Sequence, residues 1–166
     1  MTVRALRIIE FLHLLLYALV LGVFWGTWFS LSRSITSITP PTFLEVGKTM
    51  MGNLGGPMSI LMPAAILTAL PALFLLYRAG ARASLALMAL GFALLIVALI
   101  ITLTVNVPID FQIRDWTVHT LPPEWTDIRD RWQRFHTART AASLAGFACA
   151  LAASLRALPD GRTRPL

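Results

Sequence analysis

Four long runs of apolar residues make up most of this chain, and no other feature restricts its fold as strongly. They cover about residues 5–30, 57–77, 83–105 and 135–158, and short polar stretches separate them. Each run is close to the ~20 residues that a helix needs to cross a bilayer. Inside a bilayer, the backbone N–H and C=O groups of a segment must form their hydrogen bonds with each other, so each run is expected to be a helix. The sequence therefore predicts an all-α integral membrane protein, a four-transmembrane-helix bundle that forms one domain.

The basic residues lie at the ends of the apolar runs, which decides the expected orientation. The net charge is +6, but the basic residues do not share a polar face, so nucleic acid is not expected as a partner. One side of a four-span topology would carry Arg4, Arg7, Arg78, Arg82, Arg156, Arg162 and Arg164. The other side is equally basic, although acidic residues accompany most of its arginines. The positive-inside rule then predicts both termini in the cytoplasm, in a bacterial-type inner membrane.

Prolines and glycines mark the expected breaks between the spans. Pro40 and Pro41 would stop a helix, so residues 31–56 are expected to be a loop that holds at most a short interfacial helix. Pro63 and Pro71 lie inside the second run, where prolines are tolerated in membrane helices and predict a kink.

Residues 106–134 form the polar segment of the chain, and we expect it to lie outside the membrane. The third helix is expected to end at Asn106 and Pro108, because Pro stops a helix and Asn satisfies its free backbone groups. A fourth helix should begin after Pro123, before the membrane does, and its first turns should form an extended amphipathic start. This segment is the expected place for any chemistry.

Polar residues of the first run share one helical face with aromatic ones. Glu10, His13, Tyr17, Phe24 and Trp28 recur at helical spacing, so this face should look into the bundle. A carboxylate and an imidazole three residues apart also occur as metal ligands in di-metal bundles, but no second pair is visible here. The favoured reading of Glu10 and His13 is a hydrogen-bonded pair or a candidate proton relay. Cys149 has no partner cysteine, which excludes a disulfide framework.

The fourth run carries a single stripe of polar and small residues. Arg129, Trp132, His136, Arg139 and Ser143 follow helical spacing, and the stripe continues into Gly146 and Ala150. Small residues permit close helix contact, so the whole stripe is expected to face inward. Ionisable groups within a membrane are costly, which favours function for His136 and Arg139. The charges of Asp127, Asp130, Arg131 and Arg134 are more simply read as solvated, and His119 as exposed.

The polar segment resembles the C-terminal signature of the anthrone oxygenase-like family of small four-span membrane proteins. The family pattern is Asn-x-Pro-x-Asn, then Trp, then Arg-Trp-x-x-x-His-x-x-Arg. This chain matches it at Asn106, Pro108, Trp125, Arg131, Trp132, His136 and Arg139, and has Asp110 where Asn is commoner. Characterised members oxidise polyketide anthrones to anthraquinones with O₂ and need no added cofactor.

The resemblance implies roles for the residues of the signature. An anthrone has an acidic CH₂ group, so a base must remove a proton and donors must hold the enolate oxygen. His136 would be the base, with Arg139 and Asn106 as the donors. The candidate substrate-binding residues are Trp132, Asp110, Trp28 and Trp125. The implied function is a cofactor-independent membrane oxygenase that acts on an activated aromatic or polyketide CH₂, with a hydrophobic small molecule and O₂ as its partners.

Two other readings remain open. The same stripe could only join the third and fourth helices of a non-catalytic bundle, such as an accessory subunit or a lipid- or quinone-binding protein. The second interpretation is a metal- or haem-binding membrane protein, although the sequence predicts no set of metal ligands. His13 lies near one end of its span and His136 near the opposite end, ~20 Å or more apart at the rise of a helix, so the two could not share a small ion. The oligomeric state is left open.

Overall fold

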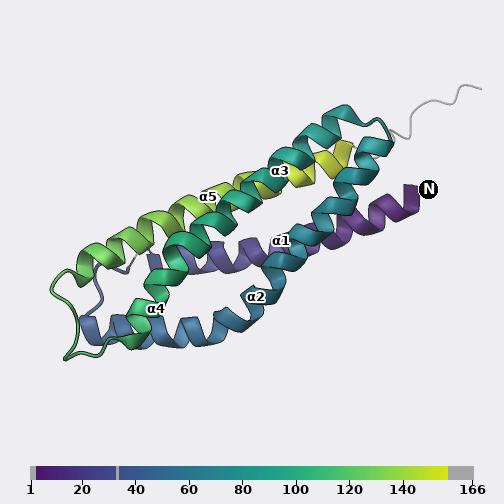
Figure 1. The fold of residues 1–166 in the computed structure, drawn as a ribbon. Helices are drawn as coiled ribbons and strands as arrows, with labels where there is room; N and C mark the ends of the chain where they lie inside the picture. Colours follow the sequence, from purple (N-terminus) through teal and green to yellow (C-terminus); the bar gives the residue numbers. More distant parts are fainter. Residues whose placement is uncertain (1–2, 33, 157–166) are drawn as a thin grey trace, which may run out of the picture.

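The computed structural model describes residues 3–32 and 34–156, and within these ranges it contains helices and no strand (Figure 1). The helices are α1 (Val3–Thr27), η1 (Trp28–Ser32), α2 (Pro40–Arg78), α3 (Arg82–Ile101), η2 (Thr102–Asn106), α4 (Val107–Asp115) and α5 (Trp125–Arg156). The two segments labelled η are π-helical turns that continue the helices before them. The predicted all-α fold is confirmed.

Four of these continuous helical stretches are long and apolar enough to cross a membrane. They are Arg4–Ser32, Pro40–Arg78, Arg82–Asp115 and Trp125–Arg156. Large apolar side chains project from their outer surface, for example Ile60, Leu67 and Phe74, which are 71%, 62% and 56% exposed. Surfaces of this kind suit lipid rather than water. The chain is therefore an integral membrane protein with four spans, as the sequence predicted.

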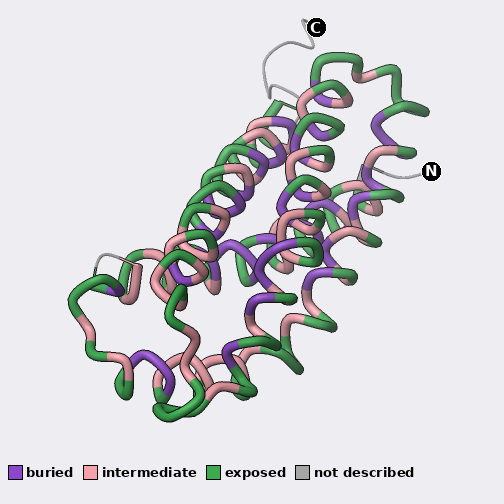
Figure 2. The backbone as a smooth tube through the Cα atoms, turned by 60° about the vertical axis from the view of Figure 1, so that its left-hand side comes forward, coloured by how far each residue is buried: buried purple, intermediate pink, exposed green. Residues whose placement is uncertain are grey.

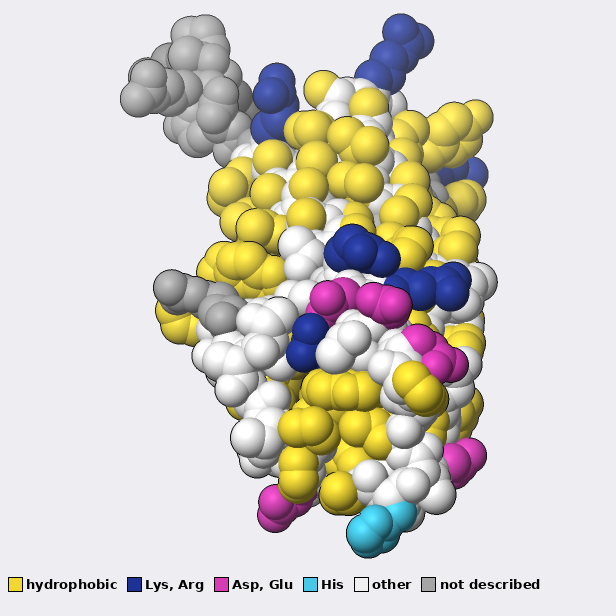
Figure 3. Space-filling view, turned by 90° about the vertical axis from the view of Figure 1, so that its left-hand side faces the viewer, with side chains coloured by type: hydrophobic (Ala, Val, Ile, Leu, Met, Phe, Trp, Pro, Cys, Tyr) yellow, Lys and Arg dark blue, Asp and Glu magenta, His cyan; other side chains and the backbone are white. Residues whose placement is uncertain are grey.

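The start of α1, the α2–α3 turn and the end of α5 lie at one end of the bundle (Figure 1). At the opposite end, acidic and basic side chains form a band, and hydrophobic side chains cover the surface above it (Figure 3). Along each helix, buried residues alternate with exposed ones, as expected when one side of a helix packs against its neighbours (Figure 2).

The expected loop over residues 31–56 is wrong, because α2 begins at Pro40 and runs for 39 residues. Pro40 and Pro41 occupy the first turn of α2, where a missing N–H breaks no hydrogen bond. Gly52, Gly55 and Gly56 lie within the helix and have no neighbour within 4 Å of an added Cβ. Figure 1 shows α2 bending near its middle, in agreement with the kink that its internal prolines predict.

The third helix does not end at Asn106 and Pro108, as the sequence suggested, but continues through η2 into α4 as far as Asp115. The backbone N–H of Val107 donates to the carbonyl of Thr102, five residues earlier, which is the π-helical pattern. Pro108 then falls in the first turn of α4, where its lack of an N–H is tolerated.

The backbones of α3 and α5 come into close contact where the two helices cross, at two glycines. A Cβ on Gly91 would lie 2.7 Å from the backbone oxygen of Gly146 and 3.1 Å from the backbone nitrogen of Ala150. A Cβ on Gly146 would overlap the Tyr17 hydroxyl of α1. Small residues bring the backbones together here, which is the usual means of helix association in a membrane. This crossing holds the stripe of α5 against α1 and α3.

Candidate active site

The polar stripe of α5 faces the inside of the bundle, as predicted. His136 and Ser143 are fully buried, and Arg129 and Arg139 are each 8% exposed. Arg131 and Arg134 are exposed, and so is Asp127, in agreement with the reading that their charges are solvated. Asp130 is partly exposed and pairs with the adjacent Arg129 at 2.8 Å. His119 is exposed as expected.

His136 and Arg139 form the centre of the buried group. The Nε–H of Arg139 donates to His136 Nδ1 at 3.1 Å, and its Nη1 donates to the hydroxyl of Thr102 in η2 at 3.0 Å. A guanidinium can only donate, so Nδ1 of His136 must be the acceptor. In the neutral imidazole the hydrogen then lies on Nε2, which is buried and has no partner among the described residues. The resting site therefore offers an unused N–H group.

Two aromatic rings enclose this pair. The ring of Trp132 stacks on His136 with 4.8 Å between centroids and an angle of 21°. Phe24, from α1, meets His136 edge-on at 6.5 Å, and the guanidinium carbon of Arg139 lies 4.6 Å from the centre of the same ring. A cation over an aromatic face is stabilised by the ring quadrupole. The face of Phe24 and the nearby charge of Asp110 thus both stabilise the arginine charge, without a direct ion pair among the described residues.

Asn106 and Asp110 reach the site from the third helix. Asn106 donates from Nδ2 to the backbone oxygen of Trp132 at 3.1 Å, and its buried Oδ1 has no hydrogen-bond partner in the described ranges of the chain. Trp132 donates from Nε1 to Asp110 Oδ1 at 2.8 Å. The structure therefore brings together five of the predicted site residues: Asn106, Asp110, Trp132, His136 and Arg139.

The other two predicted tryptophans have contacts of their own. Trp28 donates from Nε1 to the hydroxyl of the exposed Thr137 at 3.1 Å, on the flank of α5. Trp125 packs on Phe43 of α2, with 5.4 Å between ring centroids, under Arg129. Both remain predicted substrate-binding residues that nothing in the structure tests.

Glu10 and His13 form a separate buried pair on α1, 4% and 0% exposed. His13 Nδ1 lies 3.0 Å from the backbone oxygen of Ala65, which can only accept, so Nδ1 carries the hydrogen. His13 Nε2 and Glu10 Oε1 have no partner among the described residues. In the described part of the chain, no three or more His, Cys, Asp or Glu side chains gather as a metal site would require.

The sequence did not identify Phe24 or Thr102 as site residues. Phe24 was expected on the inward face of its helix, and it is buried there, but its position next to Arg139 depends on how α1 meets α5. Thr102 lies 37 residues from Arg139, inside an apolar run with no motif around it. Only the packing of the helices shows that these two residues belong to the site.

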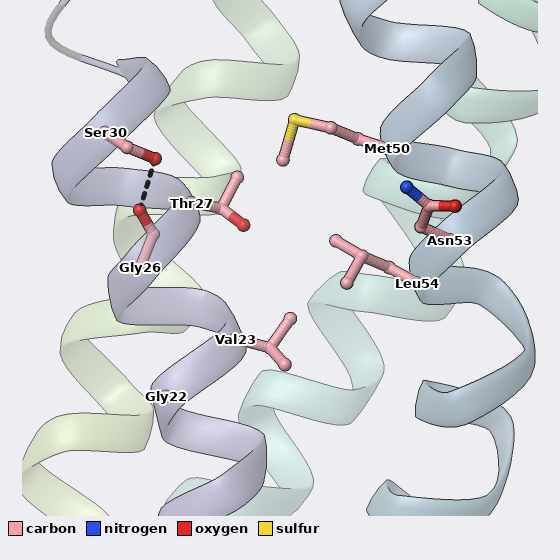
Figure 4. A pocket seen from close by; sticks show the side chains of 8 residues that line it. All are labelled: Gly22, Val23, Gly26, Thr27, Ser30, Met50, Asn53 and Leu54. Atoms are coloured by element: carbon pink, nitrogen blue, oxygen red, sulfur yellow. Dashed lines mark hydrogen bonds between the residues drawn. The ribbon is translucent and has the colours of Figure 1, made fainter.

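A cleft of about 310 Å³ lies between the end of α1 with η1 and the first half of α2 (Figure 4). The side chains of Val23, Thr27, Met50 and Leu54 point into it (Figure 4). Phe24 follows Val23 in the chain but does not line the cleft, which is separate from the buried site. The complete lining is Gly22, Val23, Gly26, Thr27, Ser30, Met50, Asn53 and Leu54.

Residues 54–149 match the family model described as Anthrone oxygenase. The match covers more than half of the chain and includes Asn106, Asp110, Trp132, His136 and Arg139, whereas α1 with Glu10, His13 and Phe24 lies outside it. No curated protein and no solved structure matches the chain. The length of the family match shows that the chain belongs to the anthrone oxygenase family.

Proposed function

We propose that this protein is a membrane oxygenase that converts an acidic CH₂ group of an apolar aromatic or polyketide substrate to a carbonyl group with O₂, without a cofactor. The observation that carries the proposal is the buried hydrogen bond between Arg139 and His136. It joins a group that can take a proton to a cation that can hold an oxyanion, inside the stretch that matches the family.

Arg139 would control when His136 acts as the base. In the resting site the lone pair of His136 Nδ1 accepts the Arg139 Nε–H, so it is engaged. A bound substrate oxygen that becomes an enolate would attract the guanidinium and free Nδ1 to take the proton. The enolate charge would also offset the repulsion between the two cations that result. The aromatic face of Trp132 would stabilise the imidazolium.

The remaining chemistry balances without another reactant. The carbanion passes an electron to O₂, the two combine, and the peroxide that forms takes up a proton. Loss of the second C–H proton and of hydroxide then gives the carbonyl group and one water molecule, so CH₂ and O₂ become C=O and H₂O. Asn106 would orient Trp132 through its hydrogen bond to the Trp132 backbone oxygen. The second hydrogen of the Asn106 amide would be a donor to the substrate oxygen.

Glu10 and His13 are proposed to exchange protons near the opposite end of the bundle. The lone pair of His13 Nε2 and the acceptor Glu10 Oε1 lie about one helical turn apart along α1, and neither has a partner in the part of the chain that the structure describes. Leaving such groups unpaired in an apolar interior costs ~1–3 kcal/mol each, so a shared proton or a bridging water would stabilise the pair.

The test is turnover of an anthrone by the purified protein, followed by O₂ consumption and by the absorbance of the anthraquinone. His136→Ala should lower turnover by ~10²–10⁴-fold, the usual contribution of a positioned base, with helix content and melting unchanged. Arg134→Ala is the matched control, because Arg134 is exposed on the same helix. The outcome that contradicts the proposal is absence of turnover in the unaltered protein, or loss of stability without a selective effect. The second result would favour a non-catalytic bundle in which the same contacts only join α5 to α3.

A further inference from the structure

Buried polar side chains continue from the candidate site toward the opposite end of the bundle, along the interface between α1 and α5. They are Glu10, His13 and Tyr17 of α1 and Ser143 of α5. Each has a polar atom without a hydrogen-bond partner in the described ranges of the chain: Glu10 Oε1, His13 Nε2 and the hydroxyls of Tyr17 and Ser143. Buried polar atoms of this kind cost stability unless water satisfies them. Their position along one interface indicates a path that water can enter.

The contacts between α1 and α5 give the order of these groups. The two helices run side by side in opposite directions (Figure 1). Phe24 of α1 lies against Arg139 of α5, and one helical stretch earlier in α1 the Tyr17 hydroxyl lies over Gly146. The same register places Glu10 beside the last turns of α5, at the end of the bundle where α1 begins.

Neighbouring groups along the interface lie about one helical turn apart or closer. Glu10 precedes His13 by one turn, and the ring centroids of His13 and Tyr17 are 5.7 Å apart. The Tyr17 hydroxyl lies beside the Ser143 side chain, close enough to interact but not in hydrogen-bond geometry. Side chains one turn apart have Cβ atoms ~5–6 Å from each other, a gap that one water molecule can bridge.

Thr140 continues the series from Ser143 to the candidate site. It is buried on the same side of α5, one turn from Ser143 and one turn from His136. Its hydroxyl donates to the backbone oxygen of His136 at 2.7 Å and can also accept a hydrogen, because a hydroxyl oxygen has two lone pairs. Arg139 occupies Nδ1 of His136, so the imidazole can meet this series only through Nε2, which carries its hydrogen.

We propose that the α1–α5 interface carries protons between His136 and the aqueous phase at the end where α1 begins. The path runs through Thr140, Ser143, Tyr17 and His13 to Glu10, with water molecules between them. Each hydroxyl or imidazole accepts one proton and passes on another, so none of them keeps a charge.

The path gives His136 a way to regain its resting state, and this purpose rests on the proposed function. When Nδ1 takes the proton of the substrate CH₂ group, the hydrogen on Nε2 leaves along the path. When the peroxide later takes a proton from Nδ1, Nε2 receives one back by the same route. One proton leaves and one returns, so the balance of the reaction is unchanged. Exchange of the Nε2 hydrogen with water needs no substrate, so it can be measured separately from turnover.

The experiment measures exchange of the His136 Nε2 hydrogen with water, by NMR of the full-length protein with isotope-labelled histidine in lipid nanodiscs. His136→Gln identifies the signal among the three histidines. Tyr17→Phe removes only a hydroxyl, and exchange should become ~10-fold slower or more, because a positioned proton-transfer group is lost. Tyr77→Phe is the matched control, since it removes the same hydroxyl from the other tyrosine of the chain, which is exposed on α2. It should leave the rate unchanged.

A second pair of variants tests the path on α5. Ser143→Ala should slow exchange as Tyr17→Phe does, whereas Ser154→Ala should not, because the Ser154 hydroxyl already donates to the backbone oxygen of Ala150. Each variant loses a single oxygen atom and should keep the helix content and melting of the unaltered protein.

The results separate the path from the proposed function. Unchanged exchange in Tyr17→Phe or in Ser143→Ala, equal slowing in the control variants, or no exchange in the unaltered protein would each overturn the path. Unchanged exchange in both would show that His136 meets water from the end where Asp110 lies. The expected slowing without any anthrone turnover would refute only the proposed function. Turnover of an anthrone with unchanged exchange in Tyr17→Phe would refute only the path.

Discussion

Replacing Gly91 by alanine should separate α3 from α5, and the structure allows the cost to be worked out. The new Cβ would lie 2.7 Å from the backbone oxygen of Gly146, whereas ordinary contact begins at 3.4 Å. The two helices must therefore part by up to the difference, 0.7 Å. The obstacle is backbone and cannot rotate away. Strain of this kind in a packed core typically costs ~1–3 kcal/mol.

Helix propensity acts in the opposite direction, so a matched variant is needed. Alanine is better than glycine by ~1 kcal/mol inside a helix. Gly55→Ala gains the same propensity without any contact, since nothing lies within 4 Å of its Cβ. The difference between the two variants in free energy of unfolding isolates the clash, and it should be ~1–3 kcal/mol in favour of Gly55→Ala. Unfolding in mixed detergent micelles, followed by circular dichroism, measures it. Equal stability of the two variants would refute the close α3–α5 crossing.

Three further predictions concern the site and the topology. Arg139→Lys keeps the charge but loses the planar guanidinium that donates to His136 and Thr102 together. Turnover, measured as O₂ consumption, should therefore fall ~10²-fold or more while helix content stays the same. Unchanged turnover would show that the guanidinium has no part in the mechanism. Glu10→Gln keeps the shape of the side chain but removes its acid, so turnover should fall while the fold is kept. Full activity would show that Glu10 and His13 only pack against their neighbours. Reporter fusions at the C-terminus and at Gly80 should both report cytoplasm, and opposite locations would contradict the four-span map.

The inward faces of the first and fourth spans could be predicted because they depend on spacing within one helix. His13, Tyr17 and Phe24, and likewise His136, Arg139 and Ser143, are polar or aromatic at helical intervals among leucines and alanines, and all are buried. An interval of this kind needs no knowledge of the other helices.

The first half of α2 could not be predicted in the same way. Pro40 and the glycines near residue 55 have the composition of a loop in water, but a helix that begins at a proline loses no hydrogen bond. Trp28 and Trp125 show a different limit. Their identity predicts a membrane interface, but which residues they contact depends on helix crossings that no local pattern contains.

The π-helical turn at η2 restricts how the length of this chain can change. A π turn holds one residue more than an α turn, so deleting one residue between Thr102 and Asn106 would restore an unbroken α-helix. Because the π turn accommodates this extra residue, the segments on either side would keep nearly the same relative rotation, whereas a deletion within the regular part of α3 or α5 would rotate its two sides by ~100°. The same deletion between α4 and α5, at residues 116–124, would rotate no helix. A single-residue gap is thus tolerable in that loop and in η2, and it is incompatible with the site inside α3 or α5, although every one of these shortened chains keeps four spans.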